Sequence, residues 1–272
     1  MAPRNRNRNR NGNWRPPPPD PPPVSDQSWP ALTMAPLENQ LSALTVRQER
    51  TEPKLPFSNP KQMVTFKVGA GWNSEEFLVY KDIACRGSKV FERAFNGGFE
   101  EGRTQTYELD DVDPDTFRYF SEWLYSQKLT LMNHEILDKS TWTEAEIQAH
   151  NIECSQEDKH LVGLWILGDK FDVVALQNYA IDQMERVRIK CGFMGITCAQ
   201  SIYENTMPGS PLRRLVVDQH ILDGTFSFMA IYASKFPQEM LADMVTIYAR
   251  VQDLPQSKKT ELRVDEYYVV DK

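Results

Sequence analysis

Several groups of residues in this sequence carry side chains that could do chemistry. Histidine and cysteine occur close together at His150, Cys154 and His160. Both residue types bind zinc, but zinc takes about four ligands in a tetrahedron, and this spacing matches no familiar zinc motif. We therefore expect residues 150–160 to form a surface loop. Cys191 and Cys198 are expected to be core or linker thiols.

Two further groups contain the residue types of a catalytic triad and of a cation site. Ser201, His220 and Asp223 could act as nucleophile, base and acid, but no G-x-S-x-G motif surrounds the serine. A run of four aspartates lacks the glycine and the distal glutamate of a calcium loop, so we expect helix capping instead; the run is Asp110, Asp111, Asp113 and Asp115. We expect no catalytic residue, no metal and no cofactor.

Charge and proline are unevenly distributed along the 272 residues. The net charge is −7, and residues 1–15 contribute +5, so the remainder carries −12. Residues 16–23 read PPPPDPPP. Arg-Asn repeats and proline runs offer few large apolar side chains, so we expect residues 1–59 to be a disordered tail. An acidic body does not suit a general binder of phosphate backbones.

Cysteine usage and hydropathy bear on the compartment. The four cysteines form no C-x-x-C pair, and no secretory leader follows the first arginines. The longest apolar run, residues 161–167, is far shorter than the roughly 20 residues that span a bilayer. We expect a reduced protein of the cytoplasm, the nucleus or both, with no membrane partner.

Alternating apolar residues predict the strands. Residues 63–68 and 76–80 are predicted to form a hairpin, and the GAG at 69–71 to be its turn, because no helix follows it and no G-x-x-G continues it. Residues 104–109 are predicted to form a third strand, and residues 129–131 a short fourth one.

Capping residues and apolar stripes predict the helices. Ser88 can cap a helix that ends where Gly97 or Gly98 adopts a left-handed conformation, so that the chain reverses into the strand at 104–109. Asp113 and Pro114 start the next helix. Residues 132–157 are expected to be a polar insertion, and helices are expected at about 158–171 and 173–189. Pro211 and the apolar residues that follow it predict the start of a further helix. Helices around a small sheet define an α+β fold.

The order of these segments resembles the BTB/POZ domain, in the version common in filamentous fungi, over about residues 62–190. The resemblance rests on VTFKVG, FLVYKDIACRGSKVFERAF, FNGGFEEG, LDDVDPDTFRYFSEWLYSQKL and LWILGDKFDVVALQNYAI. One departure is Tyr80, where the family usually has histidine. The expected domains are a tail at 1–59, a BTB/POZ domain at 60–190 with its insertion at about 132–157, and a helical extension at 191–272.

The resemblance implies a non-enzymatic protein–protein interaction module that pairs with itself or with another BTB protein. In the family, the first strand and the early helices commonly supply the pairing face. Here that points to a candidate dimer interface at Val64, Phe66, Val90 and Phe91. For Phe66 and Phe91 individually we favour ordinary core, because apolar stripes usually pack inward.

Two alternative functions stay open. The first is a substrate adaptor of a cullin-RING ubiquitin ligase, with a candidate docking surface at Phe117, Tyr119, Phe120, Trp123 and Tyr125. Cullin binders of the family often carry a hydrophobic-x-acid motif, and HLVG at 160–163 does not match it. The second is nucleic-acid binding by the arginine-rich arm, with oligomerisation raising its valency. Nucleic acid is the less favoured partner, and we expect no small-molecule substrate.

Overall fold

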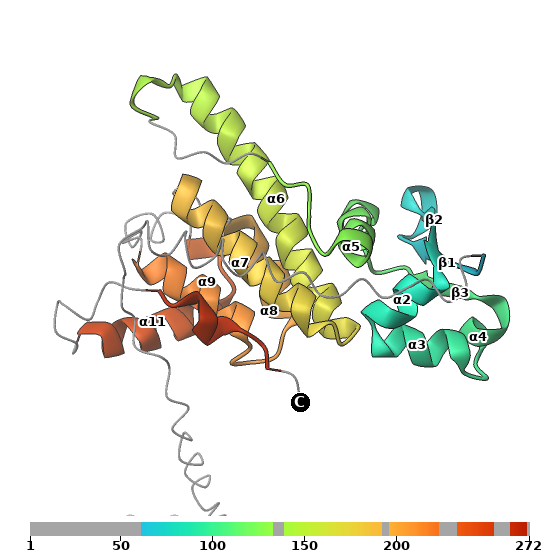
Figure 1. Ribbon diagram of the computed structural model, residues 1–272. Coiled ribbons are helices and arrows are strands. Elements are labelled where there is room, and N and C mark those ends of the chain that lie inside the picture. The colour runs from blue at the N-terminus through green and yellow to red at the C-terminus, as the bar shows by residue number, and fades with distance from the viewer. Residues whose placement is uncertain (1–60, 133–138, 192–195, 223–232, 253–261, 271–272) are drawn as a thin grey trace, which may run out of the picture. The chain divides into compact units, whose positions relative to one another are not determined.

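The computed structural model describes residues 61–132, 139–191, 196–222, 233–252 and 262–270 (Figure 1). These residues all belong to one compact unit, residues 32–272. The expected disordered tail at 1–59 lies outside the described residues.

The sheet has three strands in the order β2-β1-β3. β1 (Met63–Val68) pairs antiparallel with β2 (Glu75–Tyr80) and parallel with β3 (Thr106–Leu109), so the sheet is mixed. The first two strands and their hairpin confirm the sequence prediction, and a short 3-10 turn, η1 (Gly71–Asn73), fills the connection.

Three short helices separate β2 from β3: α2 (Lys81–Gly87), α3 (Lys89–Asn96) and α4 (Glu100–Thr104). The oxygen of Ser88 caps α3, as predicted, and accepts hydrogen bonds from the amides of Val90 and Phe91. The predicted direct reversal from this helix into the third strand is wrong, because α4 lies between α3 and β3. Gly97 is extended, with φ −82° and ψ 177°, and the left-handed residue before β3 is Gln105 instead.

The glycines of this turn serve close packing. A Cβ on Gly97 would lie 2.6 Å from the carbonyl oxygen of Arg93, and one on Gly102 would lie 2.1 Å from the carbonyl oxygen of Gly97. The side-chain amide of Gln105 donates to the carbonyl of Gly102 at 2.6 Å and stabilises the turn. Glycine is therefore required because α3 and α4 approach backbone to backbone.

Helix α5 (Pro114–Ser126) begins as predicted. Asp113 accepts a hydrogen bond from the amide of Thr116, and Pro114 occupies the first helical turn. Residues 129–131 do not form the predicted strand. Instead, the amide of Leu129 donates to the hydroxyl of Tyr179 at 3.1 Å, so a side chain satisfies the backbone that a neighbouring strand would have paired.

The helix expected at about 158–171 begins earlier than predicted, within the residues assigned to the polar insertion. Helix α6 runs from Glu144 to Lys170, so half of the expected insertion is the first half of one 27-residue helix. Its start is a capping box, in which Thr143 and Glu146 satisfy each other's backbone amides. A short turn then leads to α7 (Val174–Cys191), which packs along α6 (Figure 1). The first half of α6 was not predicted as a helix because most of its residues face solvent and show no apolar stripe.

The extension after α7 is helical, as expected. It contains α8 (Ala199–Asn205), α9 (Pro211–Leu222) and α11 (Gln238–Gln252). Leu212 and Leu215 of α9 are fully buried, and α9 packs against α11. Pro211 starts α9, as predicted, and TMPG at 206–209, where Gly209 has a positive φ of 76°, separates α9 from α8.

The last described segment, residues 262–270, lies against α7 and α9. Its 3-10 turn, η6 (Val264–Tyr267), contacts both helices. Asn178 of α7 donates to the carbonyl of Val269 at 3.0 Å and accepts from its amide at 2.7 Å. Tyr267 donates to Asp218 of α9 at 2.7 Å within the core. The chain end is thus attached by side-chain hydrogen bonds to helices far earlier in the sequence.

Candidate interaction surfaces

Three of the four candidate dimer-interface residues lie inside the domain. Phe66 and Phe91 are 0% exposed and Val64 is buried, whereas Val90 is half-buried. The structure therefore places Phe66 and Phe91 in the core, in agreement with the core interpretation. A partner could reach Val90 directly, but the other three could only support an interface from beneath.

Aromatic packing explains this placement. The ring of Phe91 lies 5.0 Å from that of Phe66 and 4.5 Å from that of Phe171, centroid to centroid. Phe66 in turn lies 5.1 Å from Phe117 of α5. Edge and tilted contacts of this kind stabilise beyond the area they bury. One cluster thus joins β1, α3, α5 and the end of α6.

The candidate docking surface on α5 is also mostly core. Phe117, Phe120 and Trp123 are buried, whereas Tyr119 is half-buried and Tyr125 is 46% exposed. The Tyr125 hydroxyl accepts a hydrogen bond from the amide of Tyr80 at 3.0 Å. A cullin could therefore contact only the two tyrosines of this set, and the adaptor role stays a prediction.

The motif compared with cullin binders is buried too. In HLVG, Leu161 is 0% exposed and Val162 is buried. The imidazole of His160 lies 3.3 Å from the hydroxyl of Thr116 in α5. This segment holds α6 on α5 and presents little side-chain surface to a partner.

The outer face of the hairpin carries apolar side chains that the sequence reasoning missed. Alternation turns Val64, Phe66 and Val79 inward. It turns Met63, Leu78 and Tyr80 to the other face, where Met63 pairs with Tyr80 and Thr65 pairs with Leu78. Leu78 is 66% exposed in the middle of its strand. The available signal was a leucine at an outward position of an alternating strand.

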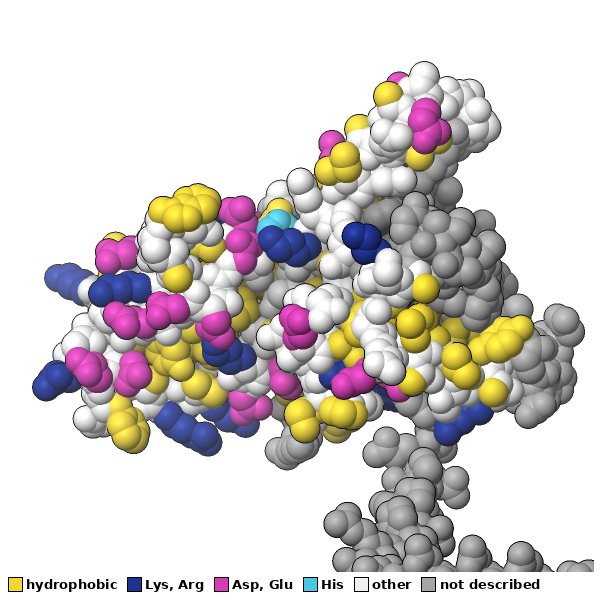
Figure 2. All heavy atoms as spheres, turned by 180° about the vertical axis from the view of Figure 1, so that it is seen from behind, with side chains coloured by type: hydrophobic (Ala, Val, Ile, Leu, Met, Phe, Trp, Pro, Cys, Tyr) yellow, Lys and Arg dark blue, Asp and Glu magenta, His cyan; other side chains and the backbone are white. Residues whose placement is uncertain are grey.

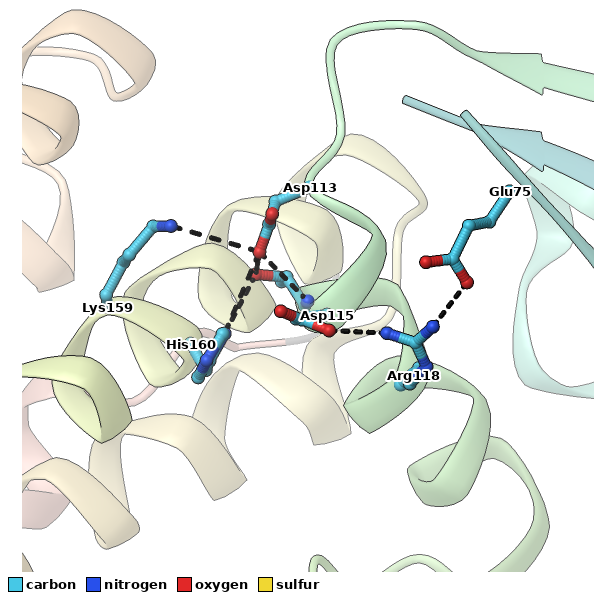
Figure 3. A network of polar contacts seen from close by, with 7 residues as sticks. Glu75, Asp113, Asp115, Arg118, Lys159 and His160 are labelled. Carbon is cyan, nitrogen blue, oxygen red and sulfur yellow. Dashed lines mark hydrogen bonds and ion pairs between the residues drawn. The ribbon is translucent and has the colours of Figure 1, made fainter. Parts of the chain in front are cut away.

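A polar network surrounds the start of α5 (Figure 3). Asp113 lies 3.9 Å from His160 and 4.0 Å from Lys159 of α6. Arg118 bridges Asp115 of its own helix and Glu75 of β2. The network thus links the sheet, α5 and α6 through exposed or half-buried charges.

The imidazole in this network favours its neutral form. Burial lowers the pKa of His160; Lys159 acts in the same direction, and the nearby carboxylates of Asp113, Asp115 and Glu157 oppose it. Because His160 faces a helix-capping aspartate and a threonine, we assign it a structural role.

The residues considered for a cation site, a catalytic triad and a zinc site have other contacts in the structure or lie on different elements. Asp111 binds Lys170 at 2.7 and 2.8 Å, and this hydrogen bond chiefly lowers the pKa of the carboxyl. His220 is buried in α9 with Nδ1 2.7 Å from the carbonyl oxygen of Val216, whereas Ser201 is exposed on α8. Asp223 lies outside the described residues. Of the suspected zinc ligands, His160 belongs to the α5 network, whereas His150 and Cys154 lie together on α6.

The fold is a small mixed sheet with helices packed on it. Residues 58–148 match the family model of the BTB/POZ domain. The chain therefore contains a BTB/POZ domain, and domains of this family are typically non-enzymatic protein-binding modules. The match ends inside α6, so the boundary at 190 stays a prediction. Within the described ranges, no helix is long and apolar enough to cross a membrane.

Proposed function

We propose that this protein is a scaffold that self-associates through the outer face of its BTB/POZ hairpin. The observation that carries the proposal is Leu78, which is 66% exposed although its strand is regular and paired. Met63 and Tyr80 lie beside it on the same face, and we call these three residues the hairpin patch.

The hairpin patch has the chemistry of a small association surface. Burying a leucine contributes about 1.5–3 kcal/mol, and in a two-fold dimer each such contact occurs twice. Lys67 and Glu108 form an exposed ion pair at 3.4 Å on the neighbouring outward positions, and this pair supplies a polar rim.

The charge distribution also favours a second copy of this chain over a strongly charged partner. Over the sheet and α2 to α5, basic and acidic side chains are interspersed (Figure 2). A surface of mixed sign repels a second copy of itself less than a surface of one sign does.

The first strand remains part of the proposed pairing face, but the residues that make the contacts differ from those expected from the sequence. Val64 and Phe66 point into the core, so the contacts come from the opposite side of the same hairpin. A second BTB protein with a similar patch would bind in the same way.

The test is the mass of the full chain in solution, measured by sedimentation or light scattering over a range of concentrations. We expect a dimer for the native protein and a monomer for Leu78→Asp. The matched control is Val245→Asp, which places the same charge on an exposed apolar position of α11. A native monomer, or equal dimerisation of both variants, would contradict the proposal.

A further inference from the structure

We propose that His150, Cys154 and Cys191 form a binding site for one transition-metal ion of the Zn²⁺ class. A ring nitrogen of His150 and the two sulfurs all lie within 4.8 Å of one another. The sequence predicted no metal here, because it grouped His150 and Cys154 with His160, and only the fold adds Cys191.

The pairing of helices α6 and α7 brings these three residues together. His150 and Cys154 are four residues apart on α6, so they share one face of the helix. Cys154 lies 17 residues before Phe171, and Cys191 lies 17 residues after Val174. Because α6 and α7 run antiparallel beside each other, equal distances from the turn bring the two cysteines face to face.

The distances suit a tetrahedral ion. Zinc bonds of about 2.3 Å to sulfur and about 2.0–2.1 Å to nitrogen place these two donors about 3.6 Å apart at a tetrahedral angle. The sulfur of Cys154 lies 3.4 Å from Nε2 of His150. A movement of about 1 Å at the longest separation in the cluster completes three ligand positions, which leaves the fourth for water.

The donor set selects the class of metal. Thiolate and imidazole favour zinc and similar borderline ions, whereas calcium and magnesium take oxygen ligands. Two thiolates and a neutral imidazole leave a zinc complex without net charge. That matters because Cys154 is 0% exposed and Cys191 is also buried, and an isolated buried charge is costly.

The surroundings orient the histidine and leave it accessible. The ring of Trp142 meets that of His150 edge-on, with centroids 5.3 Å apart. His150 itself is half-buried, so an ion can reach the cluster from the solvent side.

The ion would join the polar first half of α6 to the end of α7. Residues 144–149 offer little apolar contact, since Glu144, Ala145 and Gln148 are exposed. A metal bond to His150 and Cys154 replaces the missing apolar packing. Binding therefore stabilises this part of α6 more than the rest of the chain.

The experiment uses the full chain, reduced and freed of metal, and adds Zn²⁺ or Co²⁺ alone. We expect one equivalent to bind, and the Co²⁺ form to show the visible absorption of tetrahedral cobalt with thiolate-to-metal charge transfer. Amide hydrogen exchange at 144–153 should slow on binding. Cys154→Ser, Cys191→Ser and His150→Ala should each weaken binding on the order of 100-fold or more, since loss of an outer-shell partner alone costs about 10–100-fold.

Cys198→Ser is the matched control. Cys198 is also buried, and burial raises the pKa of its thiol to about 12, but it lies outside the cluster. Its variant should bind the metal as the native chain does. Failure of the folded, reduced native chain to bind Zn²⁺ or Co²⁺ stoichiometrically would overturn the proposal. So would binding that survives both cysteine substitutions, or a Cys154–Cys191 disulfide in a protein that binds no metal after reduction.

Discussion

The hydroxyl of Ser88 donates a hydrogen bond to the carbonyl oxygen of Phe171 at 2.6 Å while its oxygen caps α3. One buried side chain thus starts a helix of the BTB/POZ domain and satisfies the C-terminal end of α6, 83 residues later. It also fixes the position of Phe171 in the aromatic cluster, so local capping and long-range packing depend on the same atom.

Replacing Ser88 by alanine should destabilise the protein by about 2–4 kcal/mol. Loss of an N-cap costs about 1 kcal/mol, and the buried carbonyl of Phe171 loses its donor at a cost of about 1–3 kcal/mol. Urea denaturation measures the change. The control is Ser210→Ala, because Ser210 accepts a hydrogen bond from the amide of Arg213 near the start of α9. Equal losses in the two variants would show that the bond to Phe171 contributes nothing.

Phe91→Ala distinguishes core from interface. Phe91 is fully buried among aromatic rings, so its truncation should lower the free energy of unfolding by about 3–5 kcal/mol. An interface residue would instead shift the monomer–dimer equilibrium and leave the monomer's stability unchanged. Denaturation at two protein concentrations separates these results, and a stable monomeric variant would contradict the core assignment.

Gly102→Ala and Gly98→Ala form a matched pair in the turn before β3. A Cβ on Gly102 would lie 2.1 Å from the carbonyl oxygen of Gly97, whereas a Cβ on Gly98 meets nothing within 4 Å. We expect Gly102→Ala to cost about 1–3 kcal/mol through overpacking and Gly98→Ala to be nearly neutral. Thermal and urea unfolding compare the two, and a neutral Gly102→Ala would mean that α3 and α4 are not packed backbone to backbone.

Stability should depend on pH through Asp218. Burial raises the pKa of this carboxyl from its usual 3.8 to about 7; the hydrogen bond from Tyr267 and the charge of Arg214 oppose that rise, and Glu266 adds to it. Because the folded state holds the proton more tightly than the unfolded state, the free energy of unfolding should fall as the pH rises from about 4 to about 7, and then level off.

Asp218→Asn isolates this effect from other titrating groups. Asparagine does not titrate, so the difference in unfolding free energy between the native protein and the variant should change across this pH range. Urea denaturation at half-unit steps measures that difference. A difference that stays constant from pH 4.5 to pH 8 would contradict the raised pKa.

Features set by neighbouring residues could be predicted from the sequence. Ser88 and Asp113 act as caps because their partners lie two or three residues away. The conformation of Gly97 could not be predicted, because the approach of α4 decides it. The capping box of Thr143 and Glu146 was a local signal of α6, but polar composition outweighed it in the prediction.

The candidate surfaces were harder to predict for the same physical reason. An apolar stripe in a sequence shows that a face is buried, but not whether its own chain or a partner covers it. Phe66 and Phe91 belong to such stripes and pack within the chain. Cys191 joined the cysteine–histidine cluster only through the register of two helices, and no spacing motif records that register.

The family match stops at residue 148, inside α6, and this has a consequence for dissecting the protein. Gly163 packs so closely on α5 that a Cβ there would lie 2.7 Å from the Thr116 side chain. A truncation at residue 148 would remove Leu161 and Trp165 from the core and leave Phe117 and Phe120 without their covering helix. The end of the family match is therefore not the end of the folding unit, and the smallest autonomous fragment must retain the second half of α6, which carries Leu161 and Trp165.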